Sequence, residues 1–153
     1  MIIREMTLND KDTFLAMSQD FYNSEATLHG FCPEFQEQNL DSFLQGSPYI
    51  RCLIFESEEK ITGYALIAHS WSTEYGGPMI ILEELYFIPE ARHKGGSGQF
   101  FEWFFKEYRS RAAGYRLEVA PDNAYVMDIY RKYGYEPLEY LQMMKVDREQ
   151  KKE

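Results

Sequence analysis

The chain has few cysteines and no long apolar run, and both shortages limit what it can be. Only two of its 153 residues are cysteine, Cys32 and Cys52, and their spacing fits no metal motif such as C-x-x-C. No apolar stretch approaches the ~20 residues that span a bilayer, so we expect no membrane-spanning helix and no membrane partner. The opening residues, MIIREMTLND, are too polar for a signal peptide. We therefore expect a cytoplasmic protein with two free thiols and no bound metal.

Basic residues are scarce in the first part of the chain. Residues 1–91 contain 4 Lys and Arg against 15 Asp and Glu, residues 92–153 contain 12 against 10, and the formal net charge is −9. A nucleic-acid-binding face has to be basic, so we expect no nucleic-acid partner. The uneven distribution suits an enzyme with an anionic cofactor and a cationic co-substrate, although an ordinary solvated acidic surface explains it equally well.

The hydrophobic periodicity predicts one α/β domain over residues 1–153, with no linker that divides it. Strands are expected at residues 2–6, 49–56, 61–70, 79–88, 115–119 and 135–146, and helices at residues 10–22, 34–45, 96–113 and 123–134. Residues 57–60 and 71–78 are expected to be turns, and Gly114 is expected to stop the third helix. The order β-α-α-β-β-β-α-β-α-β gives a central mixed sheet with helices packed on its faces.

The segment from Ile80 to Tyr108 is the most informative part of the sequence. An apolar strand ends at Ile88, a basic, glycine-rich turn follows, and an apolar helix begins at once. A helix N-terminus leaves backbone N–H groups unpaired, and glycine lets an anion approach them closely. The turn therefore predicts a phosphorylated ligand. Since the sequence has neither a G-x-x-x-x-G-K-[ST] P-loop nor a Rossmann G-x-G-x-x-G at its first strand–helix turn, we do not expect a nucleotide site of those kinds.

Two motifs carry a family resemblance. Arg92-x-x-Gly95-x-Ser97 matches the pyrophosphate-loop pattern Gln/Arg-x-x-Gly-x-Gly/Ala. Further on, Asn123 is followed seven residues later by Tyr130 and then by Gly134-Tyr135. With the predicted element order, these motifs make nearly the whole chain resemble the GNAT superfamily of acyl-CoA-dependent N-acetyltransferases, and the resemblance implies the GNAT fold with acetyl-CoA as co-substrate.

The loop departs from the family pattern at Ser97, where Gly or Ala is usual. An alternative register, His93-x-x-Gly96-x-Gly98, restores both glycines but puts His where Gln or Arg is expected. We prefer the Arg92 register because it keeps the usual distance from the strand and retains the guanidinium group.

The resemblance also implies which residues contact the cofactor. The strand backbone at Phe87 and Ile88 would pair with the pantetheine, and the Phe87 amide would polarise the thioester carbonyl. The pyrophosphate would be held by Arg92, His93, Lys94, Gly95, Gly96, Ser97, Gly98 and Gln99. Asn123 would contact the cofactor or cap its own helix, and the cap is the favoured role of Asn at such a position.

Acetyl transfer to an amine needs an acid for the leaving thiolate and a base for the attacking amine, whose pKa is ~10 when it resembles lysine. Tyr130 matches the family tyrosine beside the thioester sulfur and is the expected acid, with Tyr133 as the fallback. The alternative is that Tyr130 simply packs among neighbouring tyrosines.

Three glutamates are candidates for the base. Glu83 and Glu84 are adjacent in an apolar strand, so they point to opposite faces, and at least one is expected to face a wet cleft. They resemble the acidic pair of spermidine/spermine acetyltransferases. Glu118 lies five residues before Asn123, as in ribosomal-protein alanine acetyltransferases, and ranks after the pair. Each is otherwise an ion-pair partner or part of a solvated strand face.

The resemblance places the acceptor beside residues 21–35 and 71–75, which contain a mixture of aromatic and acidic side chains; these residues are equally consistent with core and surface. We expect direct acetyl transfer to a small cationic amine, such as a polyamine, an amino sugar or an amino-acid derivative. The alternatives are a protein N-terminus or lysine as acceptor, and a module that binds acyl-CoA without turnover. Dimerisation is common in the family, and the apolar segment Leu138–Val146 offers an edge strand for a homodimer.

Overall fold

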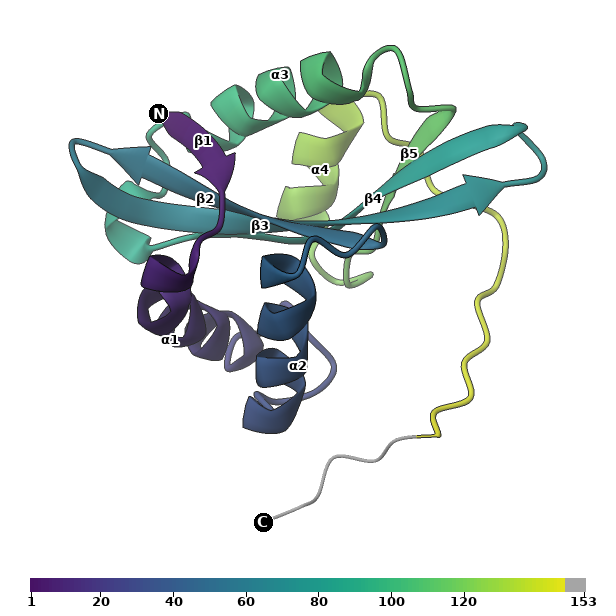
Figure 1. Ribbon diagram of the computed structural model, residues 1–153. Coiled ribbons are helices and arrows are strands. Elements are labelled where there is room, and N and C mark those ends of the chain that lie inside the picture. The colour runs from purple at the N-terminus through teal and green to yellow at the C-terminus, as the bar shows by residue number, and fades with distance from the viewer. Residues whose placement is uncertain (148–153) are drawn as a thin grey trace. The chain divides into compact units, whose positions relative to one another are not determined.

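The computed structural model describes residues 1–147, which fall into two compact units that divide between Ala120 and Pro121. The first unit contains a five-stranded sheet in the order β1-β2-β3-β4-β5 (Figure 1). Its strands are β1 (Ile2–Glu5), β2 (Ile50–Ser57), β3 (Lys60–Ser72), β4 (Gly77–Phe87) and β5 (Gly114–Leu117). Strands β1 to β4 pair with one another in antiparallel fashion, and β5 pairs with β4 in parallel. The predicted mixed sheet and the α/β fold class are confirmed.

Three α-helices cover the sheet. They are α1 (Lys11–Tyr22), α2 (Pro33–Leu44) and α3 (Gly96–Tyr108), and two short 3-10 helices, η1 (Leu8–Asp10) and η2 (Pro89–Ala91), precede α1 and α3. Helices α1 and α2 lie on one face of the sheet and α3 on the other (Figure 1). None of the helices within residues 1–147 has the length and apolarity needed to cross a membrane. Both cysteines are free thiols.

Each face of the sheet has its own apolar core. Under α1 and α2, the buried cluster includes Phe14, Met17, Leu40 and Tyr64. On the other face, α3 turns the fully buried rings of Phe100, Phe101 and Phe104 onto the sheet. Phe104 follows Phe101 by three residues and Phe100 by four, which places all three rings on the side of the helix that is buried. The apolar side chains of α1 and α3 therefore account for the packing of helices on both faces of the sheet.

A buried carboxylate anchors the start of α1. Asp10 is 4% exposed and accepts hydrogen bonds from two nitrogens of Arg4, both at 2.8 Å, and from the amide of Thr7 at 2.8 Å. The hydrogen bonds from Arg4 lower the pKa of Asp10 to about 2. Asp10 directly precedes α1, and its side chain bonds back to Thr7 and to Arg4 on β1 and makes no cap bond to α1.

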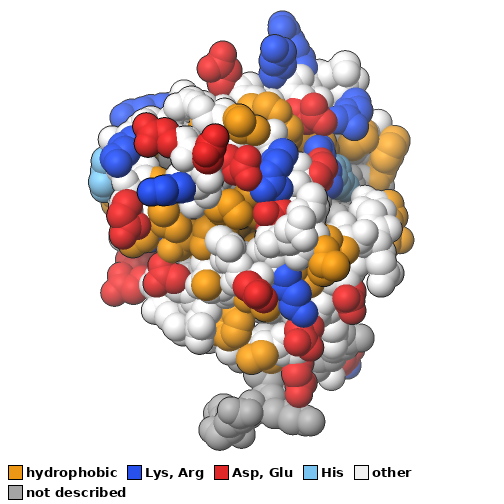
Figure 2. Space-filling model, turned by 60° about the vertical axis from the view of Figure 1, so that its left-hand side comes forward, with side chains coloured by type: hydrophobic (Ala, Val, Ile, Leu, Met, Phe, Trp, Pro, Cys, Tyr) orange, Lys and Arg blue, Asp and Glu red, His pale blue; other side chains and the backbone are white. Residues whose placement is uncertain are grey.

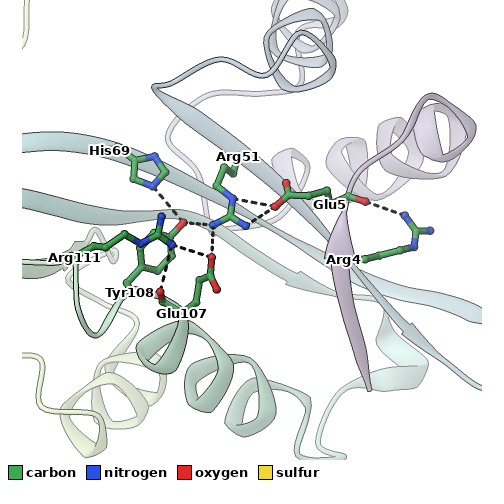
Figure 3. Close-up of polar contacts among 7 residues, drawn as sticks. All are labelled: Arg4, Glu5, Arg51, His69, Glu107, Tyr108 and Arg111. Carbon is green, nitrogen blue, oxygen red and sulfur yellow. Dashed lines mark hydrogen bonds and ion pairs between the residues drawn. The ribbon is translucent and has the colours of Figure 1, made fainter.

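A polar network ties the C-terminal end of α3 to the strands (Figure 3). Arg51 on β2 donates to the hydroxyl of Tyr108 at 2.7 Å and to Glu107 at 3.3 Å, and it pairs with Glu5 on β1. The same guanidinium group lies 5.9 Å from the ring centroid of Trp103. One arginine thus joins three elements.

Two predicted boundaries were wrong. Residues 71–78 were expected to form a turn, but Trp71 pairs with Pro78 in the β3–β4 ladder, and the turn is confined to residues 73–76. Helix α3 was expected to reach Ala113 and to stop at Gly114. It ends at Tyr108, because the Ala113 amide donates to the Pro78 carbonyl at 2.7 Å and Gly114 begins β5.

The second unit contains α4 (Ala124–Lys132) and an extended segment after it. A strand was predicted over residues 135–146, but the structure shows none between Tyr133 and Asp147. A strand needs a neighbouring ladder to pair its backbone groups, and none of the described strands pairs with this segment. Several of its apolar side chains are exposed, among them Leu141 at 89% and Met143 at 92%.

Candidate active site

A β-bulge in β4 separates the two adjacent glutamates. Leu66 on β3 pairs with Glu84 and the next residue, Ile67, pairs with Leu82, so Glu83 is an extra residue without a partner on β3. A bulge of this kind bends the strand and redirects a side chain. As a result, Glu83 is exposed while Glu84 is 7% exposed.

Glu84 is held by two tyrosine hydroxyls on the side of the sheet covered by α1 and α2. Tyr22, the last residue of α1, donates to Oε1 at 2.7 Å, and the fully buried Tyr64 on β3 donates to Oε2 at 2.7 Å. Burial raises the pKa of Glu84, while the two hydroxyl donors act in the opposite direction. Both carboxylate oxygens are therefore engaged inside the protein.

Glu83 and Glu118 form an acidic pair where β4 and β5 part. Strand β5 ends at Leu117, which pairs with Leu82, so the next residue on each strand is one of these glutamates. Desolvation and then the charge of Glu118 raise the pKa of Glu83, and Arg116 lowers it. Glu118 was predicted within a strand but follows the end of β5, where its side chain is exposed.

The β4 edge continues beyond its pairing with β5. The ladder between these strands ends at Leu82, whereas β4 extends to Phe87. Since the Ile88 amide donates to Thr62 toward β3, and ladder bonds alternate in direction, the amide and carbonyl of Phe87 face away from β3. This is the stretch of backbone that the family resemblance assigns to pantetheine.

The glycine-rich loop links this edge to the N-terminus of α3. His93 has a φ of 60° and Gly95 a φ of +81°, so the chain enters the helix through the left-handed region. Gly96 is the first residue of α3, and a Cβ atom there would lie 2.6 Å from the Phe87 ring. A glycine is thus required at 95 by conformation and at 96 by close contact, while the side chains of Arg92 to Lys94 are exposed.

The loop side chains differ in their partners. Arg92 donates from Nε to the Phe87 carbonyl at 2.9 Å, and a terminal nitrogen of its guanidinium group lies 3.9 Å from Oδ2 of Asp20. The side chain of Gln99 accepts a hydrogen bond from the Met1 amino group at 3.0 Å. The first amides of α3 have no acceptor within the helix, so this end offers donors and a positive dipole end to an anion. Charged side chains of both signs are interspersed on the face shown in Figure 2.

Two site residues belong to the second unit. Asn123 precedes α4 and accepts a hydrogen bond from the Val126 amide at 3.3 Å, so the predicted helix cap is observed. The Tyr130 ring lies edge-on to the Tyr135 ring at 6.0 Å between centroids, and burial raises the pKa of Tyr130. A phenol with a raised pKa stays protonated near neutral pH.

The residues expected around the acceptor divide into two groups. Phe21 is a core residue that packs against Tyr64 and Tyr86, each at 6.5 Å between centroids. Trp71 and Tyr75, on the β3–β4 hairpin, are 65% and 69% exposed. Phe21 therefore belongs to the core, whereas Trp71 and Tyr75 lie on the surface.

Sequence reasoning missed the tyrosines whose hydroxyls donate hydrogen bonds to the acidic side chains. Tyr64 and Tyr86 lie on adjacent strands and donate to Glu84 and Asp20, respectively. The available signal was a tyrosine within an otherwise apolar strand, since a buried tyrosine hydroxyl usually needs a polar partner.

A model of the acetyltransferase (GNAT) family matches residues 15–135. The chain belongs to this family. The match spans most of the first unit and continues into the second as far as residue 135, and the prediction of an acyltransferase is confirmed. A comparison with curated proteins finds no match.

Solved structures of acetyltransferases share the GNAT fold of this chain. A possible acetyltransferase from Clostridium difficile 630 aligns with a TM-score of 0.80 at 17% identity, covering 97% of this chain and 98% of that one. AAC(6')-Iy in complex with the bisubstrate analog CoA-S-monomethyl-acetylneamine aligns with a TM-score of 0.74 at 14% identity, covering 96% and 98%. The aminoglycoside antibiotic 6'-N-acetyltransferase AAC(6')-IG from Acinetobacter haemolyticus has a TM-score of 0.72 at 14% identity, covering 97% and 100%.

Proposed function

We propose that this GNAT acetyltransferase moves an acetyl group directly from acetyl-CoA to a small cationic amine. The observation that carries the proposal is the exposed acidic pair, Glu83 and Glu118, beside the β4 edge that β5 leaves unpaired. The two carboxylates attract an ammonium group, and one of them can act as the base that removes its proton. The acceptor class is thus argued from charge, and the reaction from the family.

The residues present fit acetyl-CoA. The outward amide of Phe87 suits the extended pantetheine, and the left-handed turn at Gly95 with the first amides of α3 suits the pyrophosphate. Bound acetyl-CoA supplies the activated acyl group. In this proposal His93 to Gln99 surround the phosphates, and Asn123 acts chiefly as a cap.

Glu83 is our choice of base, and Glu84 its structural neighbour. A base has to reach the amine or a water bound to it, and Glu83 is exposed while both oxygens of Glu84 already accept tyrosine hydroxyls. The raised pKa of Glu83 makes it a better proton acceptor than an ordinary carboxylate. Glu118 supports this role by raising that pKa.

Tyr130 is our choice of acid for the leaving thiolate, because its raised pKa keeps the phenol protonated. A covalent acetyl-cysteine is not part of the proposal. Cys52 is 2% exposed and burial raises its pKa, so its thiolate is strongly disfavoured, and Cys32 lies in no nucleophile motif. We therefore propose direct transfer of the acetyl group from acetyl-CoA to the amine, without an acetyl-cysteine intermediate.

An amino sugar is one acceptor in this class, and two structural neighbours that are aminoglycoside acetyltransferases, or hold an acetylneamine analog, support it. We also propose that both units form one domain, since the family match crosses the boundary between them. The free thiols support a cytoplasmic location, and the exposed apolar residues after Pro137 support a homodimer. A protein amine as acceptor and an acyl-CoA-binding module without turnover are the alternatives.

The test is acetyl-CoA binding by calorimetry, followed by CoA release over a panel of polyamines, amino sugars and amino acids. We expect binding, and turnover on a cationic amine. Glu83→Gln should lower kcat by about 100-fold or more with little change in acetyl-CoA affinity, as for loss of a general base. Tyr130→Phe should also lose turnover and keep CoA binding.

Matched variants separate the candidate bases. Glu84→Gln and Glu118→Gln should lower kcat less than Glu83→Gln does. The choice of Glu83 fails if Glu84→Gln has the larger effect. Binding without turnover on any small amine would favour a protein acceptor or a non-catalytic module, and absence of acetyl-CoA binding would contradict the proposal as a whole.

A further inference from the structure

We infer that Asp20 on α1 is a positioning residue for the glycine-rich loop, and that Arg92 braces this loop from its strand side rather than contacting phosphate. The inference rests on the proposed function, because it concerns the loop that would hold the pyrophosphate. It assigns roles to two side chains whose contacts lie outside the glycines of the motif.

Three contacts hold the Arg92 side chain. Its Nε donates to the Phe87 carbonyl at 2.9 Å, a terminal nitrogen lies 3.9 Å from Oδ2 of Asp20, and its guanidinium carbon lies 5.5 Å from the centroid of the Tyr86 ring. Two of these partners are at the end of β4 and the third is on α1. The side chain is therefore folded back onto the strand that leads into the loop.

Tyr86 fixes the place of Asp20. Its hydroxyl donates to Oδ2 of Asp20, the same oxygen that faces Arg92. The Tyr86 ring is 6% exposed and packs between Phe21 at 6.5 Å and Tyr64 at 5.6 Å. Burial and Asp20 raise the pKa of Tyr86 to about 12, so the phenol remains a donor at neutral pH. The buried Tyr86 ring thus holds the Asp20 carboxylate in place through its hydroxyl, and that carboxylate pairs with Arg92.

The brace acts at the point where the loop begins. The Arg92 amide donates to the Pro89 carbonyl at 3.2 Å and closes η2. Immediately afterwards His93 and Gly95 adopt left-handed conformations, which are uncommon for residues other than glycine. A fixed Arg92 gives this strained turn a defined start and keeps the first amides of α3 in one position.

A phosphate-binding role for Arg92 predicts the opposite response to a change at Asp20. If the guanidinium group contacted the pyrophosphate, Asp20 would compete with the ligand for it, and removal of the Asp20 charge would tighten CoA binding. If the guanidinium group braces the loop, removal of that charge loosens the loop and weakens binding. The direction of the change distinguishes the two roles.

The experiment measures CoA affinity of Asp20→Asn by calorimetry. Asparagine retains an oxygen for the Tyr86 hydroxyl but loses the charge that faces Arg92. We expect CoA binding to weaken by about two- to fivefold, the scale of an exposed ion pair, with a matching rise in the KM for acetyl-CoA and no change in kcat. Unchanged or tighter CoA binding would overturn the inference.

Two further variants control for charge and for shared action. Asp12→Asn removes the same charge from an exposed position of α1 and should leave CoA affinity unchanged. Arg92→Lys keeps the positive charge but loses the Nε donor, and it should weaken CoA binding as Asp20→Asn does. Because both changes break one brace, the double variant should bind CoA no more weakly than either single variant, whereas additive losses would contradict the brace.

A readout without ligand separates this inference from the proposed function. Trypsin cleaves after Lys94, which is exposed in the loop. Asp20→Asn should be cut there faster than the wild-type protein and Asp12→Asn should not. If the wild-type chain fails to bind CoA, the proposed function fails, yet faster cleavage of Asp20→Asn still supports the brace. If CoA binds and Asp20→Asn is cut at the wild-type rate, the brace alone is overturned.

Discussion

The hydroxyl of Tyr22, the last residue of α1, donates to Oε1 of Glu84 on β4 at 2.7 Å. This bond connects a helix to a strand residue that lies 62 positions away in the chain. The hydroxyl of Tyr64 on β3 donates a second hydrogen bond to Oε2 of the same carboxylate. A carboxylate that is 7% exposed thereby keeps two partners. The Tyr22 bond joins α1 to β4 beside the bulge, and the Tyr64 bond joins β3 to β4.

Tyr22→Phe should destabilise the protein. The variant keeps the ring but leaves Oε1 of Glu84 buried without its donor, which costs about 1–3 kcal/mol. Urea unfolding near neutral pH measures the change. Tyr49→Phe is a suitable control, since Tyr49 is 73% exposed, and it should change the free energy of unfolding little.

Glu84→Gln should gain stability relative to the wild type as the pH rises. Burial raises the pKa of Glu84 above its usual 4.5, so ionisation of the folded protein is unfavourable and wild-type stability is lost as the pH rises through the folded pKa. Glutamine keeps an oxygen for one tyrosine and cannot ionise. Unfolding free energies between about pH 4 and 8 measure the difference. A difference that does not vary with pH would contradict this account.

His69 should make the protein less stable in mild acid. Nε2 of His69 lies 3.2 Å from the hydroxyl of Tyr108, which also accepts a hydrogen bond from Arg51. Burial, Arg51 and Arg111 lower the pKa of His69 below 6.5. The unfolded chain therefore binds the proton more readily, and stability falls as the pH drops below 6.5.

His69→Gln should flatten that part of the stability profile, as measured by unfolding between about pH 5 and 8. His29→Gln, at an exposed position, should leave the slope as it is in the wild type. An identical slope in His69→Gln would place the pH dependence elsewhere in the molecule.

The turn between β2 and β3 can be improved. Glu58 and Glu59 have φ values of 52° and 61°, and they form a two-residue hairpin turn in which both central residues are left-handed. Asn-Gly suits such a turn far better than Glu-Glu. The double change Glu58→Asn, Glu59→Gly should raise the free energy of unfolding by about 1 kcal/mol or more. Glu58→Gln with Glu59→Gln removes the same charges and should give no such gain.

Gly96→Ala should damage both the fold and cofactor binding. The added Cβ atom would lie 2.6 Å from the Phe87 ring, which stacks at 5.0 Å on the fully buried Phe55 and has little room to withdraw. We expect a loss of about 1–3 kcal/mol in stability, as for overpacking, together with weaker CoA binding. In Gly30→Ala the added atom meets nothing within 4 Å, so this variant should resemble the wild type.

The sequence predicted most elements of the first unit because their apolar residues recur at helix or strand spacing. It misplaced the end of α3, since Ala112 and Ala113 favour helix, yet the chain leaves the helix to pair with β4 at Pro78. It also treated Gly76 to Pro78 as a turn, although the paired strands continue through Gly77 and Pro78. In both places a ladder bond between distant residues overrode a local preference.

The candidate site was predictable only where a local motif marks it. The glycine loop and the Asn123 cap follow from short-range patterns, but the bulge at Glu83 depends on the register between β3 and β4. Strict alternation separates Glu83 from Glu84 without saying which one is buried. The partners Tyr64 and Tyr86 depend on the same register, so sequence spacing alone does not reveal them.

The anchoring of α3 bears on the entropy of ligand binding. Its C-terminal end is joined to β2 by the bond from Arg51 to Tyr108, and its middle is packed through Phe100 and Phe104. The amides at its N-terminus are therefore oriented before any anion arrives. For the CoA binding proposed above, ordering on binding would be confined to the few residues between η2 and α3, so little affinity would be lost to conformational entropy.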